Sequence, residues 1–200
     1  EMDHVVNYDD IGTMLNATEI YGSSYVNNEW KTERLTENTV ADMAPTVASS
    51  NDRAIVAWRS LSATAMPEDG REDQDITAMF NAKNTINYRI FDGEKWKEAS
   101  VAYNGSAGTV SAINSAMLTD GTSLLVYSVR TGSDVTTTET FYTVIDTDGE
   151  VVTTGRLTND SYTDTNIQAA AVGDQFVVGW YSEHAAGEKG ASDETVVSHD

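Results

Sequence analysis

An acidic stretch near the middle of the chain has the residue types of a cation site. Residues 68–75 read Glu-Asp-Gly-Arg-Glu-Asp-Gln-Asp, a dense cluster of carboxylates. Hard cations such as Ca²⁺ bind clustered carboxylate and carbonyl oxygens. Asp69, Asp73 and Asp75 are therefore candidate calcium ligands, and calcium is the cofactor that this stretch suggests. The spacing matches no EF-hand, so a solvated run of charge explains the same residues.

Three other residues are candidates for contact with a polar ligand. Tyr162 stands in a polar segment, where its ring could stack on a sugar, although a packed anchor of the loop is the simpler explanation. Arg71, within the acidic stretch, and Asp164, close to Tyr162, complete the set. We assign no catalytic residue, because 32 acidic residues offer no unique carboxylate pair for glycoside hydrolysis.

The charge of the chain excludes two classes of partner. Its 200 residues include 32 acidic and 12 basic side chains, for a net charge of −20. Such a surface repels phosphate backbones and anionic membrane surfaces, so we expect neither nucleic-acid binding nor membrane insertion. No apolar run approaches the roughly 18 residues that cross a bilayer. The chain has no cysteine, and a disulfide framework or thiolate metal site is therefore ruled out.

Short strands must position these residues. Val, Ile, Thr, Tyr and Trp alternate with polar residues between Gly, Asn and Asp turn signals, as is typical of antiparallel strands. The best helical candidate, residues 75–82, is short and uncapped. The predicted strands are residues 44–49, 54–60, 85–91, 96–101, 110–118, 123–129, 140–146, 151–157, 167–172 and 175–181.

The strand pattern repeats along the chain. Segments of about 17–60, 85–130 and 140–181 align, and the tripeptide Arg34-Leu35-Thr36 returns as Arg156-Leu157-Thr158. Four strands per repeat favour an all-β fold of four-stranded antiparallel meander blades, a partial β-propeller. A β-sandwich and an open β-solenoid are the alternatives. Trp58 and Trp180 occupy matching positions, which predicts that both are buried between blades.

Alternation of turns places the candidate site at one end of the sheets. Successive turns of an antiparallel meander alternate between its two ends. The tight turns near residues 27, 51, 92, 120, 148 and 173 are therefore expected at one end, and every long loop at the other. Long loops on a rigid scaffold carry binding residues, so the long-loop end is the candidate functional face. Its predicted loops are residues 36–43, 61–84, 102–109, 131–139, 158–166 and 182–193.

Three turns resemble the Asp-box of sialidase-like propellers, in degenerate form. The run Ile90-Phe91-Asp92-Gly93-Glu94-Lys95-Trp96 has the Asp, Gly and Trp but lacks the Ser. Residues 146–149 keep the acids without the Trp, and residues 27–30 keep only the Trp. The resemblance implies blades at 44–101 and 110–157, with partial blades at both ends. Flanking blades of a longer chain, or a second copy, would complete them.

The same resemblance bears on function. Family sialidases carry an early Arg-Ile-Pro motif, which this chain lacks, and they bind the substrate carboxylate with an arginine cluster. Arg34 and Arg156 belong to the structural repeat. We therefore expect a non-catalytic, secreted or cell-surface segment of a bacterial protein that binds an extracellular glycan or protein in adhesion. The alternative is a fragment of a sialidase-like glycoside hydrolase.

Overall fold

The computed structural model describes residues 18–61, 84–131 and 137–183. Within these ranges the chain consists of β-strands and their connections, and no described segment is a helix that could cross a membrane. The helical candidate at 75–82 lies outside the described residues. The strands are β1 (Tyr21–Val26), β2 (Glu29–Arg34), β3 (Ala41–Ser50), β4 (Arg53–Leu61), β5 (Asn84–Phe91), β6 (Ser100–Tyr103), β7 (Thr109–Met117), β8 (Ser123–Arg130), β9 (Thr138–Ile145), β10 (Val151–Arg156), β11 (Thr163–Val172) and β12 (Gln175–Glu183).

Neighbouring strands pair antiparallel in chain order, which confirms the predicted all-β, antiparallel fold. One sheet has the order β3-β4-β5-β6, and a second ladder runs β7-β8-β9-β10. Two further hairpins, β1–β2 and β11–β12, precede and follow these sheets. The second hairpin joins the β7–β10 ladder only through one parallel pair, Thr163 with Thr138.

The tight turns have the backbone conformations that their residues predict. Asn27, Asn28 and Asn51 have positive φ, as do Gly121 and Gly173. Asn and Gly tolerate this left-handed region, which two-residue hairpin turns require. The turn chemistry therefore fixes the register of the hairpins from local sequence.

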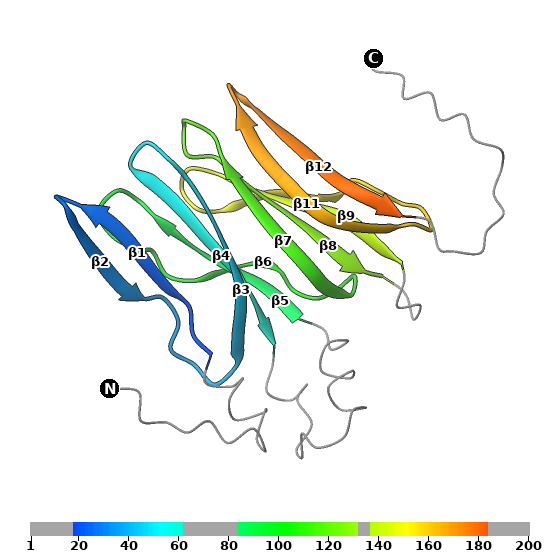
Figure 1. Cartoon of the computed structure of the whole chain (residues 1–200), viewed down its shortest axis with the longest axis horizontal. Helices are drawn as coiled ribbons and strands as arrows, with labels where there is room; N and C mark the ends of the chain where they lie inside the picture. The colour runs from blue at the N-terminus through cyan, green and yellow to red at the C-terminus, as the bar shows by residue number, and fades with distance from the viewer. Residues whose placement is uncertain (1–17, 62–83, 132–136, 184–200) are drawn as a thin grey trace.

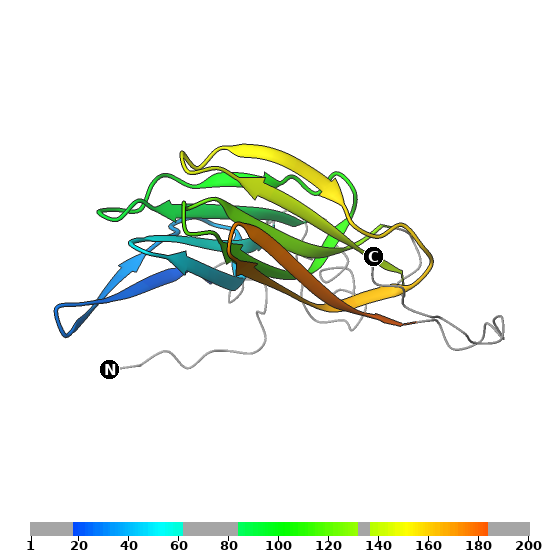
Figure 2. The ribbon, with the colours of Figure 1, turned by 90° about the horizontal axis from the view of Figure 1, so that it is seen from above.

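The four sheet units lie in a row, with β1–β2 at one end and β11–β12 at the other (Figures 1 and 2). The first strands of the last three units, β3, β7 and β11, pack side by side. Side chains link these strands: the hydroxyls of Thr46 and Ser115 lie 2.9 Å apart, and the Ala169 N–H donates to Asn114 Oδ1 at 3.0 Å. Small residues on these strands allow the close approach.

The main core lies between the β3–β6 and β7–β10 ladders. Alternate residues of the strands face it, and its largest members include Ile55, Ile86, Tyr88, Leu125, Tyr127 and Ile145. A second cluster joins the first hairpin to the next sheet, and consists of Ile20, Leu35, Val56 and Trp58.

The two repeat-equivalent tryptophans differ in burial. Trp58 is 2 % exposed, as predicted, and its indole N–H donates to Asp42 Oδ1 at 3.0 Å. The prediction was wrong for Trp180, which is 39 % exposed. The reason is positional: β5 covers the outer edge of β4, whereas no described strand pairs with the outer edge of β12.

The strand predicted at 96–101 begins later than expected. Only an isolated bridge joins Trp96 to Phe91, and β6 starts at Ser100. The Asp92 carboxylate accepts the backbone N–H groups of Glu94 and Lys95, at 3.1 and 3.0 Å. These bonds hold the segment as a turn and delay its entry into the sheet.

Replacement of Trp58 by alanine tests the packing of the second cluster. Trp58→Ala should lower the free energy of unfolding by about 3–5 kcal/mol, because it leaves a cavity and removes a donor from Asp42. Trp30→Ala is the matched control, since Trp30 is 69 % exposed and should change stability by less than about 0.5 kcal/mol. Equal effects in urea titrations would contradict the described burial.

Candidate functional site

The structure places the sequence-predicted site residues in two groups. Asp69, Arg71, Asp73 and Asp75 lie outside the described residues, so calcium binding by this stretch stays a prediction. No cluster of metal-ligand type occurs within 18–61, 84–131 and 137–183. Tyr162 ends the loop between β10 and β11, and Asp164 follows it on β11.

Hydrogen bonds between neighbouring turns show that the tight turns share one end of the molecule. The Asn51 side chain donates to Thr119 O at 2.8 Å, and Lys97 Nζ donates to Asp148 O at 2.8 Å. Arg53 donates to Thr147 O at the same end. The described longer loops, at residues 35–40, 104–108 and 157–162, occupy the other end, as the alternation of turns requires.

Two buried carboxylates meet at the long-loop end of the second ladder. Glu139 is 1 % exposed and accepts the Asp160 N–H at 3.0 Å and the Thr158 hydroxyl at 2.7 Å. Arg156 forms an ion pair with it at 2.6 Å. Because charged donors and a backbone amide surround the carboxylate, its burial is compensated. Glu139 thus anchors the 157–162 loop to β9.

Asp164 is buried as well, but it is poorly supplied with donors. Its Oδ2 contacts the hydroxyls of Thr158 and Thr140 at 2.5 and 3.2 Å. The single hydroxyl proton of Thr158 cannot serve both Glu139 and Asp164. The Oδ1 atom of Asp164 is buried without a hydrogen-bond partner. A buried unpartnered oxygen of this kind costs free energy and calls for a physical explanation.

The first hairpin carries the same arrangement. Glu19 accepts from Thr36 Oγ1 at 2.5 Å and from the Asn38 N–H at 3.1 Å, and it pairs with Arg34 at 2.8 Å. These contacts correspond one for one to those of Glu139. The repeated Arg-Leu-Thr tripeptide therefore marks a repeated carboxylate anchor. Sequence reasoning missed Glu19 and Glu139, although each precedes its tripeptide by a similar distance.

Asp42, near the start of β3, is the counterpart of Asp164, near the start of β11. Its Oδ1 accepts from Trp58 Nε1 at 3.0 Å and from Ser60 Oγ at 2.5 Å. The Asn38 amide donates to Oδ2 at 2.8 Å. Asp160 is the counterpart of Asn38 in the loop beside Asp164, and an ionised aspartate has no side-chain proton to donate. Asp42 is thus fully supplied with donors, in contrast to Asp164.

Glu19, Asp42 and Glu139 are held in structural contacts by their hydrogen-bond donors. Arg34 and Arg156 are committed to Glu19 and Glu139, so neither is free to bind a substrate carboxylate. Arg156 also lies over the Phe141 ring at 5.5 Å. The residues that line a cavity of about 480 Å³ beside it include Tyr103, Tyr127 and Phe141, and the ring of Tyr127 packs on the other two.

A second hollow at the long-loop end is lined largely by polar side chains. It has a volume of about 450 Å³ and lies between the 35–40 loop and the start of β5. Glu37 projects into solvent, and Asn87 donates to Ser60 Oγ at 2.7 Å with its amide nitrogen. We call it the long-loop hollow; it is lined by Leu35, Thr36, Glu37, Asn38, Val40, Trp58, Ser60, Thr85, Asn87 and Ala99.

No family model matches this chain, and no curated protein or solved structure matches it.

Removal of the threonine hydroxyls tests the two anchors. Thr36→Val and Thr158→Val should each lower the free energy of unfolding by about 1.5–3 kcal/mol, because a buried carboxylate and a backbone N–H each lose a partner. The control is Thr32→Val, since Thr32 is exposed and bonds only with Ser23 among described residues. Urea unfolding gives the comparison, and losses as small as that of the control would contradict the anchoring role.

The pH dependence of stability tests the first anchor separately. Burial by itself raises the pKa of Glu19, but the Thr36 hydroxyl, the Asn38 N–H and Arg34 together hold this pKa below its ordinary value. A lowered pKa means that the stabilisation is complete above the ordinary value and is lost as the pH falls through the lowered one. Glu19→Gln should therefore destabilise the protein most at neutral pH, with a gap from the unmodified chain that narrows in acid. A gap independent of pH between 7 and 3 would contradict this assignment.

Proposed function

We propose that this chain is a non-catalytic β-propeller segment that binds an extracellular glycan or protein. Its two four-stranded ladders would be successive blades, in the register 44–101 and 110–157. The antiparallel pairing of each ladder in chain order supports this arrangement, as does the side-by-side packing of β3, β7 and β11. Propeller blades have four antiparallel strands each and are repeated around an axis.

The proposal of a non-catalytic protein rests on the structural role of the buried acidic side chains. Glu19, Asp42 and Glu139 are held by threonine, arginine or tryptophan donors in structural clusters. A hydrolase needs an acid that can reach substrate, and a sialidase needs unpaired arginines beside it. The arginines beside Glu19 and Glu139 are paired with these carboxylates, and the long-loop hollow is lined mostly by neutral groups.

The ligand site that we propose is the long-loop hollow together with the neighbouring loop ends. The Thr85 hydroxyl, the amide oxygen of Asn87 and the exposed carboxylate of Glu37 suit the hydroxyl-rich surface of a glycan. Tyr162 remains a candidate contact on the 157–162 loop. A bacterial cell-surface or secreted location fits the high negative charge, and adhesion is the role that we propose.

Binding to immobilised glycans tests the proposal. We expect the chain to retain a subset of neutral glycans, and Asn87→Ala and Glu37→Ala to weaken retention by at least about tenfold, which corresponds to about 1.4 kcal/mol. Asp174→Ala is the control, since Asp174 lies in a tight turn at the opposite end. Hydrolysis of a fluorogenic sialoside by the chain would overturn the proposal and favour the glycoside hydrolase alternative.

A further inference from the structure

The first hairpin is equivalent to the second half of a four-stranded ladder. In both β1–β2 and β9–β10 the strand pair is held by the same bonds. Leu35 N–H donates to Ile20 O at 2.7 Å, and Leu157 N–H donates to Thr140 O at 2.7 Å. The Glu19 and Glu139 anchors also coincide. Hence β1 and β2 correspond to the third and fourth strands of a sheet whose first two strands are not supplied by the described chain beside them.

The last hairpin is equivalent to the first half of a ladder. Asp164 pairs with Ser182 across β11–β12, as Asp42 pairs with Ser60 across β3–β4. Both hairpins have a bulge at the same place, where Ala44 and Asn166 have φ of 52° and 51°. Hence β11 and β12 correspond to the first and second strands of a sheet whose third and fourth strands are missing among described residues.

The surroundings of Asp164 show which contacts the missing strands would complete. Trp58, covered by β5, donates to Asp42 Oδ1, but Trp180 at the equivalent position is 39 % exposed. Asp164 Oδ1, the counterpart of that acceptor, is buried without a partner. Leu157 is 43 % exposed, whereas its counterpart Leu35 is 4 % exposed. Equivalent residues are thus buried and hydrogen-bonded where a third strand is present, and they are exposed or without a partner where it is absent.

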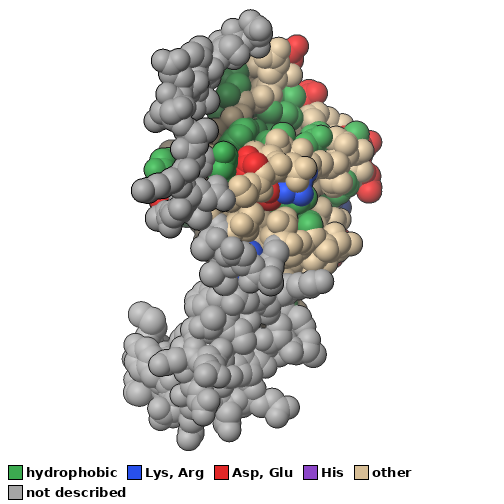
Figure 3. Space-filling view, turned by 90° about the vertical axis from the view of Figure 1, so that its right-hand side faces the viewer, with side chains coloured by type: hydrophobic (Ala, Val, Ile, Leu, Met, Phe, Trp, Pro, Cys, Tyr) green, Lys and Arg blue, Asp and Glu red, His purple; other side chains and the backbone are tan. Residues whose placement is uncertain are grey.

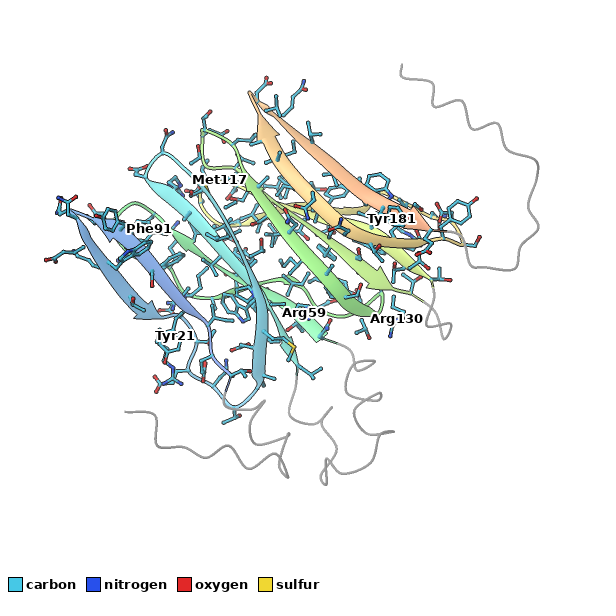
Figure 4. All side chains as sticks on the ribbon, in the orientation of Figure 1. Tyr21, Arg59, Phe91, Met117, Arg130 and Tyr181 are labelled. Carbon is cyan, nitrogen blue, oxygen red and sulfur yellow. The ribbon has the colours of Figure 1, made fainter. Side chains whose placement is uncertain are left out.

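Exposed apolar side chains gather on both half-sheets. On β1–β2 they include Tyr21 at 60 % and Tyr25 at 59 %, and on β11–β12 they include Val177 at 54 % and Tyr181 at 60 %. Tyr21 and Tyr181 lie at opposite ends of the molecule, so one chain does not bring its own two halves together (Figure 4). Figure 3 shows hydrophobic side chains exposed on the face seen from the β11–β12 side. Open strand edges with exposed apolar residues bind further strands.

We propose that the free edge of β12 pairs with β1 of a second copy of this chain, so that two half-sheets form one complete sheet. The inference rests on the propeller arrangement proposed above. The described residues of one copy form two full ladders and two complementary halves. Two copies would thus supply six four-stranded sheets, a number within the range of four to eight blades that propellers typically have. Each copy then gives its β12 edge to the other, around a two-fold axis.

Proline variants block each half of the contact in turn. Leu35 bonds to Ile20 O, so alternation along β1 turns the N–H of Ser23 toward the free edge. Gln175 pairs with Val172 across the two-residue turn, so the N–H of Val178 likewise faces away from β11. Ser23→Pro and Val178→Pro remove these donors, and proline is tolerated on edge strands. Ser23→Thr and Val178→Thr keep the N–H and are the matched controls.

The experiment is sedimentation equilibrium of the full chain at about 0.15 M salt, which screens the charge of −20 on each copy. We expect twice the 21.7 kDa mass of one chain for the unmodified protein and for both threonine controls. Each proline variant alone should raise the dimer dissociation constant by more than about tenfold. An equimolar mixture of the two should regain dimers, because one intact β12 meets one intact β1.

The outcomes separate the possible occupants of the β12 edge. A monomer at all concentrations overturns the inference and assigns the edge to another segment or protein. Loss of dimer in Val178→Pro but not in Ser23→Pro also overturns it, and indicates pairing of two β12 edges. Failure of the mixture to regain dimers, with both variants folded by circular dichroism, overturns it as well. Glycan retention by a monomer would leave the proposed function standing, and a dimer without glycan retention would leave this inference standing.

Tryptophan fluorescence gives a second readout that a loss of folding would not imitate. Pairing onto β12 should cover Trp180 and bring its indole N–H to Asp164, as β5 does for Trp58 and Asp42. We expect a blue shift of the emission on dimer formation, which Trp180→Phe abolishes while the mass stays that of a dimer. A dimer whose emission does not shift would contradict pairing at this edge.

Discussion

The backbone hydrogen-bonding capacity of the strand edges is the constraint on which the rest of this structure depends. Each sheet satisfies its inner strands through neighbours that follow in the chain, and short turns at one end make this pairing local. At β1 and β12 the described residues leave one edge of each hairpin without a partner strand, as they also do at the last strands of the two ladders, β6 and β10. The β11–β12 hairpin matches the first two strands of a four-stranded sheet, and the β1–β2 hairpin matches the last two. The open edge of β12 is therefore the kind of edge that the open edge of β1 would pair with.

The buried carboxylates secure the connections between sheets. Glu139 ties the loop after β10 to β9, and Glu19 does the same for the loop after β2. A buried carboxylate is costly unless several donors surround it, so each cluster specifies one arrangement of its loop.

Local sequence was sufficient to predict most of the strands and the chemistry of the turns. The Asn and Gly residues at 27, 28, 51, 121 and 173 have the positive φ that hairpins require, and Trp58 is buried as its apolar strand indicates. Trp180 was mispredicted because burial of a strand residue depends on its next neighbour in the sheet, which the sequence of the strand itself does not encode. The delayed start of β6 has a local cause in the Asp92 turn.

The candidate site was harder to anticipate than the fold. The roles of Glu19 and Glu139 depend on contacts between strands that are separated by loops of different length, and only the recurrent Arg-Leu-Thr tripeptide points to them. Asp164, predicted as a ligand contact, is buried among threonines. Asp69, Arg71, Asp73 and Asp75 lie outside the described residues, and the acidic stretch that contains them keeps its two interpretations.

Hydrogen exchange along β12 measures most directly whether its edge is paired. If a second copy supplies the third strand, the amides of Val178 and Trp180 exchange slowly at high protein concentration and faster on dilution. The equivalent amides of Val56 and Trp58 on β4, which pair within one chain, should be protected at every concentration. Fast exchange of Val178 and Trp180 at all concentrations, beside protected Val56 and Trp58, would contradict the completion of this sheet by a second copy.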